Sequence, residues 1–160
     1  MLIQHLHRFR QNLSPTALKI IMNLWPPFLG TGIKIETISD DFRHVEVSLT
    51  LRWYNQNYVG THFGGSIYAL ADPFFMLILI KNLGPDYIVW DKAAYIDFKK
   101  PGLSKICANF ILSEEQITDI RRKADDNEKY IFDLPVDVID QEGEIVASIT
   151  KTLYVRNKAK

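Results

Sequence analysis

The chain has 160 residues, enough for one domain, and its 47% hydrophobic and 24% charged residues are typical of a soluble globular domain. Its formal net charge is zero, which argues against nucleic acid or an anionic membrane as a partner attracted by bulk charge. The one cysteine, Cys107, excludes an internal disulfide, and we expect it to be a small core residue in a strand.

The N-terminal part predicts an arm followed by a short helix. Residues 1–13 have no clear apolar period, and no hydrophobic segment of the form found in secretory signals follows the basic start. Ser14-Pro15 is typical of a helix start, with serine as the N-cap and proline at the first helical position. Apolar residues then recur at helical spacing as far as Trp25, and we expect Pro26-Pro27 to end the helix.

Two strands and a polar loop are predicted next. Residues 32–38 and 45–53 alternate between apolar and polar side chains, as half-buried strands do. The turn residues 39–41 separate them, so the two runs predict a hairpin. Residues 54–65 are then expected to form a polar loop.

A long apolar segment from Ser66 to Leu83 predicts a central helix that is covered on most sides. Pro73 lies inside this segment and removes one helical hydrogen bond, so we expect a kink at Asp72-Pro73. The segment approaches the length of a membrane span, but Asp72 and Lys81 favour a buried helix. We therefore expect no membrane span and a cytoplasmic location.

Four more strands and one short helix are predicted in the second half of the chain. Ser113 to Gln116 resembles a capping box that opens a helix ending near Lys123, with a loop at 124–128. Pro101-Gly102 is expected to be a turn between the first two strands, and residues 141–143 form a hairpin turn between the last two. The strands are expected at residues 93–99, 104–112, 130–139 and 144–155.

This order of elements predicts an α+β fold in which an antiparallel sheet packs on a central helix. We expect one domain over residues 14–156, preceded by the arm at 1–13 and followed by a basic tail at 157–160. The histidines of the arm are too isolated for a metal site, and no metal-ligand cluster is evident in the sequence.

The candidate functional residues lie between Asn57 and Asp72. Gly64 and Gly65 open the predicted helix, where backbone amides lack partners and the helix dipole favours negative charge. A substrate carbonyl oxygen can approach these amides closely, which is the geometry of an oxyanion site. Asn57 can orient a water or a carbonyl. Asp72 places a carboxylate about two turns inside an apolar helix, and an unpaired buried carboxylate costs several kcal/mol.

Each of these residues also has a purely structural interpretation. The glycine pair can serve tight packing of the helix start, and Asn57 can shape a turn. Asp72 can satisfy a freed amide or a lysine across an interface. His62 is open to three interpretations, namely loop packing, substrate contact and catalysis.

The same segment resembles the signature of hotdog-fold thioesterases of the phenylacetate-pathway (PaaI-like) type. That signature reads Asn-x-x-Gly-x-x-His-Gly-Gly, followed seven positions later by an acidic residue, and Asn57, Gly60, Gly64, Gly65 and Asp72 fall in register with it. A hotdog branch of uncharacterised domains is more similar. It has Gly-Thr-x-Phe-Gly-Gly, then Tyr-Ala-Leu-Ala-Asp-Pro, and a C-terminal Lys-Thr-Leu-Tyr-Val like Lys151 to Val155.

The resemblance implies a hotdog fold, with a six-stranded antiparallel sheet wrapped around the long central helix. It also implies hydrolysis of an acyl-CoA or acyl-carrier-protein thioester, with Asp72 as general base or nucleophile. The Gly64 amide would polarise the thioester carbonyl, and Asn57 would hold the water or the carbonyl. The neighbouring residues would bind substrate, namely His62, Phe63, Gly65 and Ser66.

The resemblance further implies that the acidic residue and the glycine site meet across a dimer interface, so a homodimer or a tetramer built from two dimers is expected. No metal and no cofactor are expected, apart from CoA as part of the substrate. The histidine that usually precedes the glycine pair is Phe63 here, and His62 stands one place earlier. Two alternatives therefore stay open: a non-catalytic hotdog module that binds acyl thioesters or lipids, and a hotdog hydratase or dehydratase.

Overall fold

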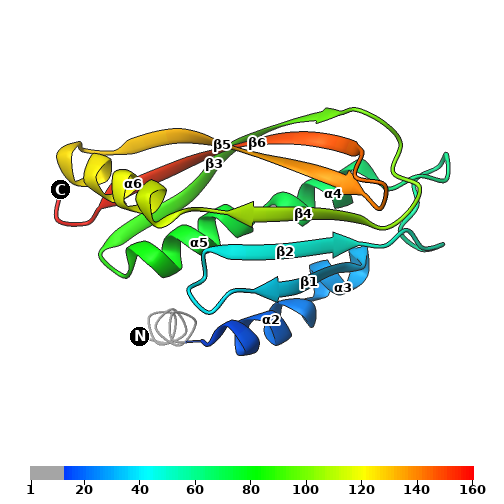
Figure 1. Ribbon diagram of the computed structural model, residues 1–160, viewed down its shortest axis with the longest axis horizontal. Helices are drawn as coiled ribbons and strands as arrows, with labels where there is room; N and C mark the ends of the chain where they lie inside the picture. The colour runs from blue at the N-terminus through cyan, green and yellow to red at the C-terminus, as the bar shows by residue number, and fades with distance from the viewer. Residues whose placement is uncertain (1–12) are drawn as a thin grey trace.

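The computed structural model describes residues 13–160, and its helices and strands follow the predicted order (Figure 1). The six strands form one antiparallel sheet in the order β1-β2-β4-β5-β6-β3. The helices are α2 (Pro15–Asn23), α3 (Pro26–Thr31), α4 (Gly64–Ala71), α5 (Phe74–Leu83) and α6 (Glu114–Asp126). The strands are β1 (Ile33–Ile38), β2 (His44–Leu49), β3 (Tyr87–Phe98), β4 (Ile106–Ile111), β5 (Tyr130–Asp140) and β6 (Ile145–Asn157).

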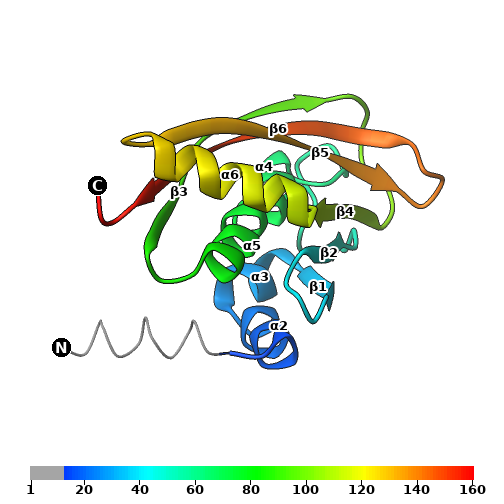
Figure 2. The ribbon, with the colours of Figure 1, turned by 60° about the vertical axis from the view of Figure 1, so that its left-hand side comes forward.

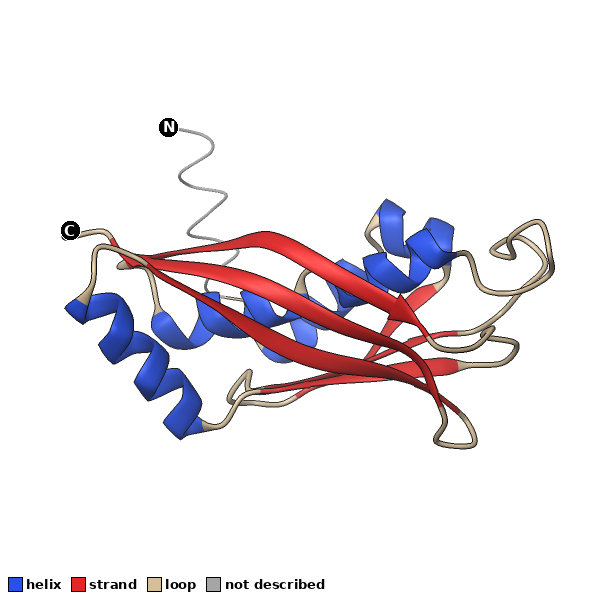
Figure 3. Cartoon of the chain, turned by 90° about the horizontal axis from the view of Figure 1, so that it is seen from above, coloured by secondary structure: helices blue, strands red, loops and turns tan. Residues whose placement is uncertain are grey.

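The sheet curves around α4 and α5, which run through its concave side (Figures 2 and 3). This arrangement is the α+β hotdog fold that the sequence predicts. The expected kink is present, because the helix is interrupted between Ala71 and Phe74 at Asp72 and Pro73. The helix begins at Gly64 rather than at Ser66, since Phe63 has an extended backbone and acts as the N-cap.

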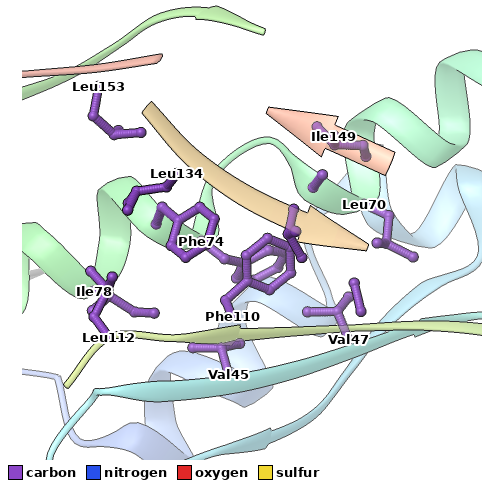
Figure 4. Close-up of a cluster of buried hydrophobic side chains, with 14 of the residues drawn as sticks. Val45, Val47, Leu70, Phe74, Ile78, Phe110, Leu112, Leu134, Ile149 and Leu153 are labelled. Carbon is purple, nitrogen blue, oxygen red and sulfur yellow. The ribbon is translucent and has the colours of Figure 1, made fainter. Parts of the chain in front are cut away.

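Apolar side chains from the central helix and the sheet form one core (Figure 4). The ring of Phe110 on β4 lies 5.1 Å from that of Phe74 and 5.2 Å from that of Phe75, measured between ring centroids. These rings fix α5 against the middle of the sheet. By length and apolarity, one described helical stretch, Gly64–Leu83, is a candidate membrane span, and half of it is buried inside the protein.

Three helix predictions have clear outcomes. The start at Ser14-Pro15 is confirmed, because the Ser14 side chain accepts a hydrogen bond from the Ala17 amide. The capping box of α6 is also confirmed, but the helix continues to Asp126, beyond the predicted end at Lys123. Pro26-Pro27 do end α2, but they also begin α3, because proline is well suited to the first positions of a helix.

The strand hairpins β1–β2 and β5–β6 are confirmed, whereas two strand boundaries were wrong. The second strand ends at Leu49 instead of Trp53, because the buried Asn55 draws the chain into a turn. Its side chain accepts from the Arg52 amide at 2.7 Å and donates to the Thr50 carbonyl at 2.9 Å.

The strand predicted at 93–99 begins at Tyr87. A bulge between Asp91 and Ala93 shifts its register against β6, and this interrupts the alternation on which the prediction relied. Pro101-Gly102 does not join neighbouring strands, because β3 pairs with β6 while β4 pairs with β2 and β5.

The two edges of the sheet differ. At the β1 edge, the side chain of Asn23 on α2 accepts from the Ile35 amide at 2.7 Å and donates to the Ile35 carbonyl at 3.1 Å. Lys19 donates to the Glu36 carbonyl beside it. At the β3 edge, no described segment of this chain pairs with the outer side of the strand. The sheet is therefore capped on one side and open on the other.

Candidate functional site

The carboxylate of Asp72 lies at the interruption between α4 and α5. The sequence predicted a buried carboxylate, but the Asp72 side chain is 49% exposed in this single chain. The prediction was wrong because the helix breaks at this point and the side chain faces the mouth of a hollow. The carboxylate is paired, since Asp72 Oδ1 lies 3.0 Å from Lys151 Nζ.

Lys151 on β6 is the functional-site residue that the sequence reasoning missed. Its side chain is 1% exposed, although it carries an ammonium group. The Nζ atom lies 3.0 Å from Asp72 Oδ1, 3.5 Å from Asp91 Oδ1 and 5.2 Å from the centre of the Tyr68 ring. A buried charge needs such partners, because an unpaired ammonium is strongly disfavoured in the interior.

A signal for Lys151 was available in the sequence. Ile149, Lys151, Leu153 and Val155 occupy alternate positions of β6, and all four are buried. A lysine in such an inward row requires an acidic partner, and Asp72 was the one carboxylate already noted in the apolar segment.

Asp91 is the second carboxylate near Lys151, and it lies next to the bulge of β3. Burial raises the pKa of Asp91, the charge of Lys151 opposes that rise, and the charge of Asp72 adds to it. Asp91 Oδ1 is buried without a hydrogen bond from any described residue. One ammonium therefore faces two carboxylates that differ in exposure.

These residues line a hollow of about 380 Å³. Its walls also include Tyr68, Met76, Trp90 and a fourth charged side chain, Lys92. Burial raises the pKa of the Tyr68 hydroxyl, so this group stays a hydrogen-bond donor at neutral pH. The hollow thus combines an apolar wall with one accessible carboxylate, the usual composition of a small-molecule site.

The helix begins at Gly64 and Gly65, and Gly64 borders a different hollow, of about 440 Å³. Their amides occupy the first two positions of α4, where no carbonyl of the same helix can accept from them. A Cβ on Gly65 would lie 2.4 Å from the Phe63 ring, and a Cβ on Gly64 would lie 3.1 Å from the Phe98 ring. Phe63 is exposed and packs over the glycine pair, whereas Ser66 is buried within the first turn.

The Asn57 side chain is occupied by its own loop. Its carboxamide oxygen accepts from the amides of Val59 and Thr61, both at 3.0 Å. Its nitrogen donates to Thr61 Oγ1 at 2.7 Å and to the His62 carbonyl at 3.3 Å. This geometry favours the interpretation of Asn57 as the residue that shapes the loop before α4.

His62 is 3% exposed, and its Nε2 lies 2.8 Å from the Ser104 carbonyl oxygen. A carbonyl only accepts, so Nε2 carries the hydrogen in this arrangement. Burial lowers the pKa of His62, and the bond to Ser104 opposes this shift. The ring also packs against Gly102, where a Cβ would lie 2.8 Å from His62 Cδ2. Of its three interpretations, this geometry favours loop packing.

Within one chain the structure does not bring Asp72 and Gly64 together. They are separated by eight residues of nearly continuous helix, a rise of about 12 Å. They also border different hollows. No cluster of three or more His, Cys, Asp or Glu side chains that could hold a metal occurs among residues 13–160. Cys107 is half-buried, and burial raises the pKa of its thiol.

Family models and solved structures show which proteins this chain is similar to. The model of the family described as "Domain of unknown function (DUF4442)" matches residues 15–155. None of the curated protein sequences matches this one.

Several solved structures share the fold. PA5026 from Pseudomonas aeruginosa, a protein of unknown function described as a probable thioesterase, is 21% identical with a TM-score of 0.77, and the match covers 89% of this chain and 96% of that one. The thioesterase HI1161 from Haemophilus influenzae is 17% identical with a TM-score of 0.66, over 93% and 94%. The PaaI protein from the phenylacetic acid degradation operon of E. coli is 16% identical with a TM-score of 0.58, over 84% and 87%.

The environment of Asp91 predicts a specific pH dependence of stability. Because burial raises the pKa of Asp91 above its ordinary value of 3.8, the folded chain keeps this proton to higher pH than the unfolded chain. The contribution of Asp91 to the free energy of unfolding is therefore largest in acid and falls as pH rises through the folded pKa. We expect Asp91→Asn to be more stable than the wild type at neutral pH, with the difference shrinking as pH falls through the folded pKa and smallest below the ordinary value of 3.8.

Urea unfolding of both proteins between pH 3.5 and 8 measures this difference. Asp97→Asn, on the same strand but with a 43% exposed side chain paired to Lys99, is the matched control. Parallel stability curves for the wild type and Asp91→Asn would contradict the prediction.

Proposed function

This chain belongs to the DUF4442 family, whose members have no assigned function, and we propose that it is a thioesterase that hydrolyses acyl-CoA or acyl-carrier-protein thioesters. One observation carries the proposal. A carboxylate at the mouth of a hollow is held through one oxygen by a fully buried lysine, on a helix whose N-terminal amides are free to bind a carbonyl oxygen.

In the proposed mechanism Asp72 is the general base. Lys151 binds Oδ1 and fixes the carboxylate in place, so Oδ2 is the oxygen that takes a proton from water. The water oxygen attacks the acyl carbon, and the tetrahedral oxyanion is stabilised by the Gly64 amide and the dipole of α4. The carbon–sulfur bond then breaks, and the thiol leaves with the proton that Asp72 had accepted.

The two halves of this site require a second copy of the chain. Across a two-fold axis, two antiparallel α4 helices would place Asp72 of one copy near Gly64 of the other. The open edge of β3 is a suitable contact, since it carries three exposed aromatic side chains. Trp90 is 65% exposed, Tyr95 68% and Phe98 54%. We therefore propose a homodimer joined edge to edge through β3.

A non-catalytic acyl-thioester-binding module is the second candidate. It is favoured by the loop-bound side chain of Asn57 and by the burial of His62, which leave Asp72 as the main polar side chain for chemistry. Such a module would bind acyl-CoA without releasing thiol. Assays of thiol release therefore separate the two candidates.

Removing the charge of Asp72 should slow turnover strongly. We expect the wild type to release free CoA from at least one acyl-CoA of short, medium, long or aryl chain, and Asp72→Asn to be slower by about 10²–10⁴-fold, the contribution of a general base. Thiol release measures the rate, and Asp86→Asn, an exposed aspartate in the loop before β3, is the control. If acyl-CoA raises the melting temperature of the wild type but no thiol is released, the protein is a binding module and not a hydrolase.

The role of the Gly64 amide can be tested by removing its hydrogen alone. Proline suits the first position of a helix, and Phe63 already has the extended backbone that a residue before proline adopts, φ −65° and ψ 125°. We expect Gly64→Pro to lower kcat by about 10²–10³-fold, as for other lost oxyanion donors. Gly64→Ala is the matched control, because it adds a Cβ toward Phe98 but keeps the amide hydrogen. Equal rates for the two variants would rule out this amide as an oxyanion donor.

Mixing the two inactive variants tests the shared site. In a heterodimer of Asp72→Asn and Gly64→Pro, one site carries both defects and the other carries neither. Random exchange of subunits should therefore restore about a quarter of the wild-type activity. The measurement is thiol release after the two proteins are unfolded and refolded together, compared with each variant refolded alone. No recovery, with dimers present by light scattering, would mean that each site lies within one chain.

A further inference from the structure

The short helix α2 is apolar on two opposite sides. Its inner side packs Leu18 and Met22 against the core. Its outer side carries Ile20, Ile21 and Leu24, which are 54%, 48% and 64% exposed. A helix of this kind normally has a partner on both sides.

The outer apolar surface continues onto α3 through Trp25 and Leu29, which are 47% and 55% exposed. We call these five side chains the α2–α3 face: Ile20, Ile21, Leu24, Trp25 and Leu29. These are five large, exposed apolar residues within ten positions, on two helices that contact each other, and clusters of this kind mark interaction sites.

The α2–α3 face is held firmly in place. Asn23 makes two hydrogen bonds to β1, through the amide and the carbonyl of Ile35. Phe28 of α3 is 2% exposed and lies between Trp25 and Phe74, with ring centroids 5.3 Å and 6.0 Å away. The inner sides of both helices therefore already pack against the core and β1. A rotation of either helix to bury its outer apolar residues would break these contacts.

The sequence up to the end of these two helices is basic. The first 35 residues contain no Asp or Glu but four Arg and Lys residues: Arg8, Arg10, Lys19 and Lys34. The first acidic residue, Glu36, contacts three lysines. Its carboxylate lies 2.8 Å from Lys34 and 2.9 Å from Lys105, and its carbonyl accepts from Lys19. Glu46 on β2 is a second carboxylate near Lys105. Three lysines near two carboxylates leave a net positive region, although the whole chain is neutral.

We propose that the α2–α3 face binds the surface of an anionic phospholipid bilayer. Apolar side chains with a tryptophan suit the boundary between headgroups and acyl chains, and the surrounding cations suit anionic headgroups. A second copy of the same face is a poorer match, because it would bring together two regions that both have a positive net charge.

The helices α2 and α3 lie beside β1, at one end of the strand order (Figures 1 and 2). Lys151, the partner of Asp72, lies on β6, which neighbours β3 at the other end. Binding of a bilayer at one edge leaves the other edge free for a second chain. The inference therefore holds whether or not the chain is a thioesterase.

Flotation of the full chain with lipid vesicles tests this inference. We expect binding to vesicles of phosphatidylcholine with about 30% phosphatidylglycerol, weaker binding to pure phosphatidylcholine, and a loss of binding as salt is raised from about 0.05 to 0.5 M. The double variant Ile20→Ser/Leu24→Ser should bind the anionic vesicles at least about tenfold more weakly. The matched control is Leu103→Ser/Ile145→Ser, which removes two exposed apolar side chains elsewhere, 68% and 41% exposed.

Three results would overturn the inference. One is the absence of binding to anionic vesicles, and another is equal binding by the two double variants. The third is a change of oligomeric state in Ile20→Ser/Leu24→Ser, measured by light scattering, without any vesicle binding by the wild type, which would assign the face to a second copy. Circular dichroism of both double variants establishes that they are folded.

Discussion

A buried ammonium group needs carboxylates close to it, and this constraint links the main irregularities of the fold. Lys151 points inward from β6, where its side chain is almost completely excluded from water. Pro73 interrupts the central helix and sets Asp72 against the lysine, while the bulge of β3 lies beside Asp91. A regular helix and a regular strand would each have been more stable locally. The interruption and the bulge are therefore best understood together, as the means by which the charge of Lys151 is neutralised.

The constraint also shapes the chemistry that the site can perform. Two carboxylates share one ammonium but differ in environment, since Asp72 is half-exposed and Asp91 is mostly buried. A half-exposed carboxylate fixed through one oxygen can exchange protons with water in the hollow, whereas a buried one mainly balances charge. This division of roles is consistent with general-base chemistry at Asp72.

The sequence correctly predicted features that depend on residues close together in the chain. The caps at Ser14 and Ser113, the hairpins and the helix interruption at Pro73 all follow from residues close together in the chain. The missed features depend on long-range contacts. Lys151 and Asp72 are far apart in sequence, and the packing of the central helix on the sheet brings them within 3.0 Å. His62 and Asn57 also belong to the predicted site, but their hydrogen-bond partners lie in loops, where the spacing of apolar residues predicts no structure. Their side chains stabilise the loop that precedes α4.

The contrast between the two edges of the sheet limits how copies of this chain can associate by strand pairing. At β1, Asn23 and Lys19 already occupy backbone groups that an incoming strand would need. Among the described strands, β3 is the sheet edge without such contacts, and two β3 edges can pair with each other. A pair of sheets joined in this way presents a capped strand at both ends. Strand pairing between copies therefore stops at two chains. In this way a fold with a long exposed edge strand avoids assembly into open-ended fibres.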